Sequence, residues 1–198
     1  IFESGNGPTY MTFSPDERYL AYMTQHGLGS YTVIDAQEGK FVRSGEVISP
    51  VSSMVFSSDS KRLYLASWLD EVPTCIDILK NKVYKLSIIE NNLFDRLKLD
   101  KVLCVANGKL YASNGRKLYI INEEDMKVME TISDHDGLVS SATLFSERLL
   151  ITGDDNGLNY VWDLESTPML KQRLKLHNAT ITHIAVDDSG NWILTCSE

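Results

Sequence analysis

A polar residue that follows a short apolar segment recurs along this 198-residue chain at nearly constant spacing. The segments SYTVID, TCIDI, LYIIN and NYVWD are rich in β-branched and aromatic residues, which favour strands. Their polar residues are Asp35, Asp77, Asn122 and Asp163, which lie 42, 45 and 41 residues apart. A spacing this regular over four units predicts an internal structural repeat.

A second landmark keeps the same spacing. Phe13 and Phe56, 43 residues apart, occupy equivalent places in Thr-Phe-Ser-Pro-Asp and Val-Phe-Ser-Ser-Asp. Phe145 and Val186 take the same place later in the chain. A unit of about 40–45 residues with four short strands is typical of a propeller blade, so we expect an all-β propeller.

The repeat divides the chain into four blades and a half blade. The expected boundaries are about 10–44, 51–86, 101–132, 135–174 and 177–198. Residues 88–100, IIENNLFDRLKLD, do not fit the repeat and form an insertion, which is either a short helix or a loop. In the third blade, Asn107-Gly108 and Asn114-Gly115 can supply the positive φ angles of type I′ turns and predict two tight hairpins.

The fourth blade resembles a repeat of the WD-repeat (WD40) β-propeller family. A repeat of that family opens with Gly-His and closes with Trp-Asp. Here His135 takes the place of the histidine, and Trp162-Asp163 takes the place of the closing dipeptide. The half blade that begins at His177 fits the same pattern. The first three blades lack the tryptophan and fit it only loosely; its place is taken by Ile34, Ile76 and Ile121.

The resemblance implies a hydrogen-bonded tetrad of His, Ser or Thr, Asp and Trp that ties a blade together. Carried onto the fourth blade, the tetrad is His135, Thr152, Asn156 and Trp162. In the half blade, His177 and Thr195 take the first two places. An Asn in place of the Asp can accept from the imidazole without a charge, so we expect a weaker bond there.

The resemblance also implies a seven-bladed ring. At this period such a ring needs roughly 290 residues. Because open sheet edges are a liability, we expect the four and a half blades to be part of a ring in a longer protein.

Composition limits the partners and the compartment. The formal net charge of −8 argues against general nucleic-acid binding and against an anionic membrane surface. No apolar run reaches about 18 residues, so we expect no membrane span. The three cysteines form no CxxC pair, which indicates a reducing, intracellular compartment, either cytoplasm or nucleus. Each cysteine stands in an apolar run, which predicts burial.

No catalytic constellation is found. The chain has no GxSxG nucleophile elbow and no GxxxxGK(S/T) phosphate loop, and its four histidines are not paired for metal binding. We therefore expect no catalytic residues, no cofactor and no metal site. Trp68, where a strand enters a turn, is the candidate partner contact, against ordinary packing as the alternative.

These observations favour a non-catalytic protein–protein interaction scaffold, a subunit of an intracellular multiprotein complex that binds partners through propeller loops and faces. Contacts with the proteins of an RNA-containing assembly are one such setting. The alternative is a regulatory or substrate-recognition propeller attached to a catalytic domain outside these residues. An enzyme that uses a central channel ranks last, since the first strands of the blades carry no His or carboxylate.

Overall fold

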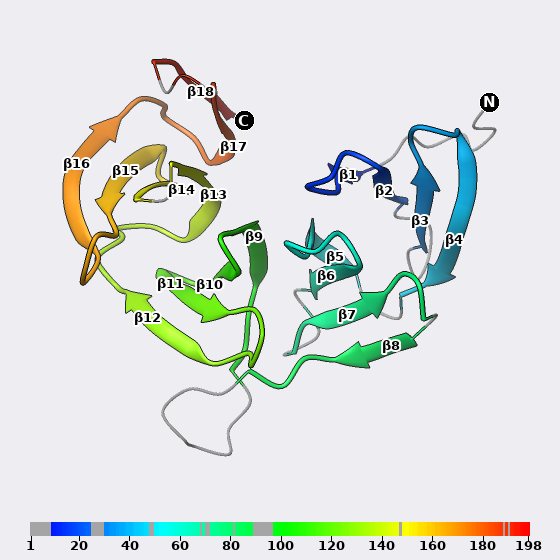
Figure 1. Cartoon of the computed structure of the whole chain (residues 1–198). Helices are drawn as coiled ribbons and strands as arrows, with labels where there is room; N and C mark the ends of the chain where they lie inside the picture. Colours follow the sequence, from blue (N-terminus) through cyan, green and yellow to red (C-terminus); the bar gives the residue numbers. More distant parts are fainter. Residues whose placement is uncertain are drawn as a thin grey trace. The chain divides into compact units, whose positions relative to one another are not determined.

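The protein is all β in the part of the chain that its computed structural model describes. These residues are 9–24, 30–47, 50–67, 69, 72–80, 82–88, 97–146, 148–187, 189 and 191–198. They form 18 strands and no helix, and therefore no helix that could cross a membrane. Four sheets have four strands each, paired in chain order, as in a propeller blade (Figure 1). The predicted fold class is confirmed.

The chain divides into two compact units, the first of which comprises Ile1–Ser87 and Leu97–Val102. It contains two antiparallel four-stranded sheets. Their strands are β1 (Tyr10–Phe13), β2 (Tyr19–Thr24), β3 (Ser30–Asp35) and β4 (Lys40–Glu46), then β5 (Val51–Phe56), β6 (Arg62–Ser67), β7 (Thr74–Asp77) and β8 (Lys82–Lys85).

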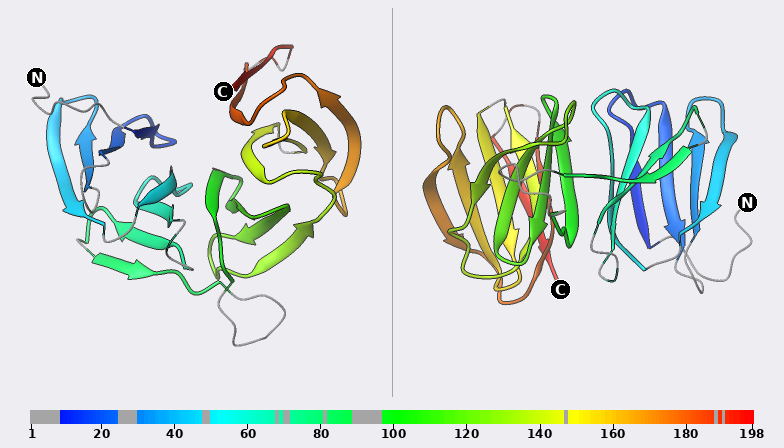
Figure 2. Two further views of the ribbon diagram at one scale, coloured as in Figure 1. Left: turned by 180° about the vertical axis from the view of Figure 1, so that it is seen from behind. Right: turned by 90° about the horizontal axis from the view of Figure 1, so that it is seen from below.

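The second unit comprises Ile88–Arg96 and Leu103–Glu198. Two four-stranded sheets and one two-stranded sheet follow one another along the chain (Figure 2). Their strands are β9 (Lys101–Ala106, whose first two residues belong to the first unit), β10 (Lys109–Asn114), β11 (Lys117–Asn122) and β12 (Val128–Ile132), then β13 (Val139–Phe145), β14 (Leu149–Asp154), β15 (Leu158–Asp163) and β16 (Met169–Lys175), then β17 (Ile181–Val186) and β18 (Ile193–Ser197).

The recurring Asp and Asn residues all perform one structural task. Each stands at the end of the third strand of a sheet, and its side-chain oxygen accepts backbone N–H groups of the turn that leads to the fourth strand. The bonds run from Gln37 and Glu38 to Asp35 (3.1 and 2.9 Å), from Leu79 and Lys80 to Asp77 (3.1 and 2.7 Å), from Glu124 to Asn122 (2.8 Å) and from Glu165 to Asp163 (3.1 Å).

The second landmark is also a turn, this time between the first and second strands. Ser14 Oγ donates to Asp16 Oδ1 over 2.5 Å and accepts the N–H of Tyr19 over 2.8 Å. Ser57 repeats both bonds with Asp59 and Arg62 at 2.6 and 2.9 Å. In the first two sheets, the spacing of the sequence repeat therefore follows from two side-chain-capped turns per sheet.

Within each unit, neighbouring sheets pack face to face through apolar side chains. One core in the first unit joins Ala21, Met23 and Val33 of the first sheet to Leu63 and Ile76 of the second. In the second unit, one core contains Tyr111, Leu118, Tyr160 and Trp162, and a smaller one contains Ile151, Ile181 and Ile184. Apolar contacts thus hold neighbouring sheets together, whereas the outer strands β4, β8 and β16 are mostly exposed.

Both predicted tight hairpins are present, but only the first has the predicted turn. Asn107 and Gly108 have φ angles of 52° and 67°. At the second hairpin only Gly115 has a positive φ, of 60°, because Asn114 is the last residue of β10 and pairs with Lys117. Of the three cysteines, only Cys75 is buried; Cys104 is half-buried and Cys196 is exposed, so the burial prediction is wrong for Cys196. Cys196 lies on β18, which pairs with β17 alone. Within the predicted insertion, residues 89–96 lie outside the described residues.

Gly157 allows two segments of the second unit to approach each other. Its φ angle is +78°, and a Cβ at this position would overlap the backbone carbonyl of His177. The Gly157 carbonyl accepts the N–H groups of Leu176 and His177, both at 3.3 Å. The contact therefore needs both the left-handed conformation and the missing side chain.

We predict that Gly157→Ala lowers the free energy of unfolding by clearly more than Gly108→Ala, measured by urea unfolding. Gly108 has a similar positive φ, but no atom lies within 4 Å of the place that an added Cβ would take, so its replacement carries only backbone strain of about 1–2 kcal/mol. Gly157→Ala adds the overlap with His177. Equal losses in the two variants would show that the close approach contributes nothing.

Candidate functional site

Three of the predicted tetrad residues meet in the core of the sheet β13–β16. His135 Nε2 lies 2.8 Å from Thr152 Oγ1, and Trp162 Nε1 donates to the same oxygen over 2.9 Å. An indole N–H can only donate, so the Thr152 oxygen accepts from Trp162 and its hydrogen is left for the imidazole. The His135 ring lies 5.0 Å from the Trp162 ring and 4.8 Å from the Tyr160 ring.

The fourth predicted residue, Asn156, does not take the tetrad's carboxylate place. Its side chain forms no hydrogen bond with His135 in the described structure; its backbone N–H donates to Asp154 Oδ1 over 3.0 Å. The buried carboxylate near His135 is Asp154, the last residue of β14, which is completely buried. Its Oδ2 accepts from the Tyr160 hydroxyl (2.9 Å) and from the Gly137 N–H (3.0 Å).

Sequence reasoning missed Asp154 because the resemblance assigned the carboxylate to the turn position two residues later. The signal was Tyr160, whose hydroxyl needs a buried acceptor. The structure also requires a glycine at position 137, because a Cβ there would lie 2.2 Å from Asp155 Oδ1 and 2.9 Å from Asp154 Oδ2. Asp154 therefore connects the segment before β13 to the strand β15.

The half blade repeats the first bond of the tetrad. His177 Nε2 lies 2.8 Å from Thr195 Oγ1, which joins the segment before β17 to β18. The spacing between histidine and threonine is 18 residues here and 17 residues in the preceding sheet. Both histidines thus tie the segment that enters a sheet to its second strand.

A comparison with protein-family models finds a match to the WD domain, G-beta repeat, over residues 169–198. The match spans β16, β17 and β18 and includes both His177 and Thr195. Residues 169–198 therefore match one WD repeat. The predicted resemblance to the WD-repeat family is confirmed, and the antiparallel four-stranded sheets agree with propeller blades of this type. A search of the curated proteins finds no match.

WD-repeat domains are typically non-catalytic. Among the described residues, no group of three or more His, Cys, Asp or Glu side chains is placed to hold a metal ion. Trp68, the predicted partner contact, lies outside the described residues.

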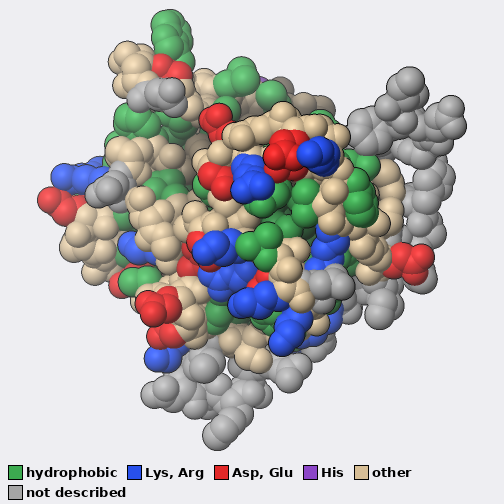
Figure 3. All heavy atoms as spheres, turned by 45° about the vertical axis from the view of Figure 1, so that its right-hand side comes forward, with side chains coloured by type: hydrophobic (Ala, Val, Ile, Leu, Met, Phe, Trp, Pro, Cys, Tyr) green, Lys and Arg blue, Asp and Glu red, His purple; other side chains and the backbone are tan. Residues whose placement is uncertain are grey.

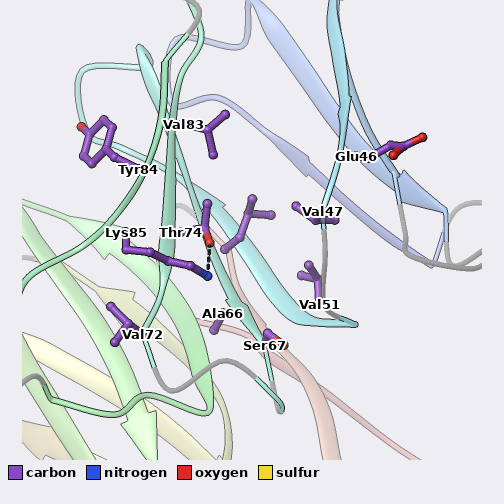
Figure 4. A pocket seen from close by; sticks show the side chains of 11 residues that line it. Glu46, Val47, Val51, Ala66, Ser67, Val72, Thr74, Val83, Tyr84 and Lys85 are labelled. Carbon is purple, nitrogen blue, oxygen red and sulfur yellow. Dashed lines mark hydrogen bonds between the residues drawn. The ribbon is translucent and has the colours of Figure 1, made fainter.

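The first unit contains an apolar groove that the sequence did not indicate. It lies between the end of β4 and the sheet β5–β8, and its volume is about 370 Å³ (Figure 4). Val47, Val51 and Leu65 line it from the core side, and Val83 and Tyr84 of the outer strand β8 line it from the other. Glu46 and Lys85 are the charged residues of the lining, and Lys85 Nζ donates to Thr74 Oγ1 over 3.0 Å.

A second hollow, of about 250 Å³, lies on the other side of Tyr84 and is basic. Lys61, Arg62 and Lys80 line it together with Asp59 and Asp77. Both carboxylates are already engaged by the turns that they cap, and Lys80 Nζ lies 3.5 Å from Asp77 Oδ2. Figure 3 shows Lys and Arg side chains gathered on the face that it presents.

The buried imidazole of His135 predicts a loss of stability in mild acid. Burial lowers the pKa of His135 from 6.5 to about 4. Below pH 6.5 the unfolded chain therefore binds a proton at this histidine that the folded chain does not bind. The free energy of unfolding consequently falls by about 3 kcal/mol between pH 6.5 and pH 4 because of His135. Above pH 6.5 the histidine is neutral in both states and this loss is absent.

We predict that His135→Gln flattens the dependence of stability on pH in this window, measured by urea unfolding at half-unit steps of pH. His183→Gln, which replaces an exposed imidazole on β17, is the matched control and should keep the slope of the natural chain. An unchanged slope in His135→Gln would contradict a buried neutral imidazole.

Asn159 is a position where a substitution is expected to raise the stability of the fold. It is 2% exposed, and neither its amide nitrogen nor its oxygen has a hydrogen-bond partner within the described residues. An unsatisfied buried amide costs about 1–3 kcal/mol. We therefore expect Asn159→Val to raise the midpoint of thermal unfolding, while Asn159→Asp lowers it. A lower midpoint for the valine variant would show that the amide is satisfied in solution.

Proposed function

We propose that this protein is a non-catalytic interaction scaffold, a subunit of an intracellular multiprotein complex. The observation that carries the proposal is the apolar groove beside β8. Val83 is 55% exposed and Tyr84 is 43% exposed, and both belong to the groove wall. Apolar side chains that rim a concave surface are typical of sites where another protein docks.

The WD repeat supports the same role, because domains of this kind serve in general as platforms for protein–protein interaction. The capped turns and the apolar cores within each unit hold the strands in place, so a docking surface built on them is formed before a partner arrives. Little ordering is then needed on binding. A setting among the proteins of an RNA-containing assembly is compatible with this role.

A second candidate is a regulatory or substrate-recognition propeller that serves a catalytic domain outside these residues. The same groove would then hold a substrate protein or the catalytic domain itself. The two candidates share the docking surface and differ in whether an enzymatic activity accompanies the protein.

The test is affinity purification of the full-length protein from its own cells, followed by mass spectrometry and quantification of partner stoichiometry. We expect a defined set of partners for the natural chain and loss of at least one of them in Val83→Asp, which places a charge in the groove. Met129→Asp is the matched control, since Met129 is 49% exposed on another outer strand, β12.

Two outcomes would decide against the scaffold. Identical partner sets for the natural chain and Val83→Asp would remove the groove from the function. A single stoichiometric enzyme, or a catalytic domain on the same polypeptide, would favour the regulatory alternative.

A further inference from the structure

The outer strand of the second sheet has an edge that is open to solvent. The sheet runs in the order β5-β6-β7-β8, so β8 pairs only with β7 and its other edge carries no partner strand within the described residues. All four residues of β8, Lys82–Lys85, are exposed. An exposed edge presents unpaired N–H and C=O groups on which an extended peptide can add as a further strand.

The charge around this edge is strongly positive, although the whole chain has a formal charge of −8. Lys82 lies directly opposite Asp77 in the strand pairing, and Arg43 of the first sheet donates to the Asp77 carbonyl over 3.0 Å. The cations at this edge and in the adjoining hollow are Arg43, Lys61, Arg62, Lys80, Lys82 and Lys85. Among the described residues, three carboxylates lie near these cations: Asp59 and Asp77, which are engaged by turn N–H groups, and Glu46, which lines the groove together with Lys85.

The remaining polar group of the edge adds no negative charge. Burial and a hydrogen bond with Cys75 raise the pKa of Tyr84 to about 12, so its hydroxyl stays protonated at neutral pH. Lys61 and Lys82 form no salt bridge with any residue that the structure describes, and both are exposed. Two cations are therefore available to an incoming group without breaking an existing pair.

The outer strand β16 of the second unit provides a contrast. It also carries three cations, but each is engaged: Lys171 with Asp163, Arg173 with Asp136, and Lys175 with the Asn156 carbonyl. A high content of Lys and Arg on an outer strand is thus not enough to leave charge available. At β8 the balance of charges remains positive.

We propose that β8 binds an extended, acidic segment of a partner protein by strand addition. Backbone hydrogen bonds to the open edge of β8 hold the segment. Its Glu, Asp or phosphorylated residues face Lys61, Lys80 and Lys82, and an apolar residue enters the groove beside Val83. Cross-strand pairs of opposite charge stabilise such a pairing, whereas two copies of β8 repel each other. The proposal rests on the interaction role proposed above and specifies the class of partner.

The test measures fluorescence anisotropy of the full chain with three labelled octapeptides. The first alternates Glu and Val, the second alternates Lys and Val, and the third repeats the Glu-Val sequence with an N-methyl group on every residue, so that neither edge of the peptide can donate. We expect binding of the Glu-Val peptide alone, with weaker affinity at higher salt, because exposed charges are screened. Removing backbone donors from a peptide of the same charge should abolish strand addition.

Charge reversal locates the site on the protein. Lys82→Glu should weaken binding of the Glu-Val peptide by about fivefold or more, since one favourable pair is replaced by a repulsion. Lys117→Glu, on β11 of the second unit, changes the net charge equally at an exposed position and should leave the affinity unchanged.

Several results would overturn the proposal: equal binding of the N-methylated peptide, equal effects of the two charge reversals, or binding of a labelled oligothymidylate in place of the acidic peptide. The last result would assign the patch to nucleic acid. If no peptide binds while Val83→Asp still loses partners in the purification experiment, the strand-addition inference fails and the scaffold function stands.

Discussion

The turn that follows the third strand of each sheet depends on a side chain that replaces missing backbone partners. Four residues one repeat apart accept the turn N–H groups, and in two sheets the same carboxylate also holds an arginine. Asp163 accepts from Arg148 Nε and Nη2, both over 2.8 Å, and Asp35 accepts from Arg18 Nε over 3.0 Å. Each arginine directly precedes the second strand of its sheet. The turn after the third strand is thereby tied to the start of the second, which fixes the register of the sheet.

This arrangement favours the charged form of the carboxylates. The guanidinium of Arg148, followed by the backbone N–H of Glu165 and by Lys171, lowers the pKa of Asp163 well below its usual range. The backbone N–H of Glu38 and the guanidinium of Arg18 lower the pKa of Asp35. Both carboxylates stay ionised at neutral pH, so the anchors of the repeat do not depend on small changes of pH. The buried His135 does respond to acid, and it belongs to only one sheet.

The fold could be predicted because its determinants lie in local turn chemistry. Asp35, Asp77, Asn122 and Asp163 bond to groups two or three residues away, so their spacing along the sequence carries the architecture directly. The tetrad was predictable only in part, because the buried carboxylate near it is held by long-range contacts and not by the residue that the resemblance assigned. Asp154 meets Gly137 and Tyr160 only after three segments have packed, and an alternative oxygen at Asn156 stands two residues away.

The groove and the basic hollow could not be predicted for the same reason. Val47 and Val83 are far apart in sequence, and each is an apolar residue of the kind that is common in any strand. The basic cluster is formed by residues from two different turns and from the start of a strand, namely Lys61, Lys80 and Lys82. The sequence therefore contains no run of basic residues that would indicate it.

Local positive charge on a chain of net charge −8 has a consequence for partner selection. At distances beyond a Debye length of about 10 Å, an acidic partner meets a molecule that repels it weakly or not at all in physiological salt. Close to β8, the same partner meets six cations, the two engaged carboxylates Asp59 and Asp77, and Glu46 of the groove. Attraction therefore acts only over short distances, where backbone pairing and the apolar groove also act. A surface of this kind selects for both sequence and conformation. Net charge does not attract a partner from a distance, and an uncharged strand that pairs with the edge gains no favourable interaction with the lysines.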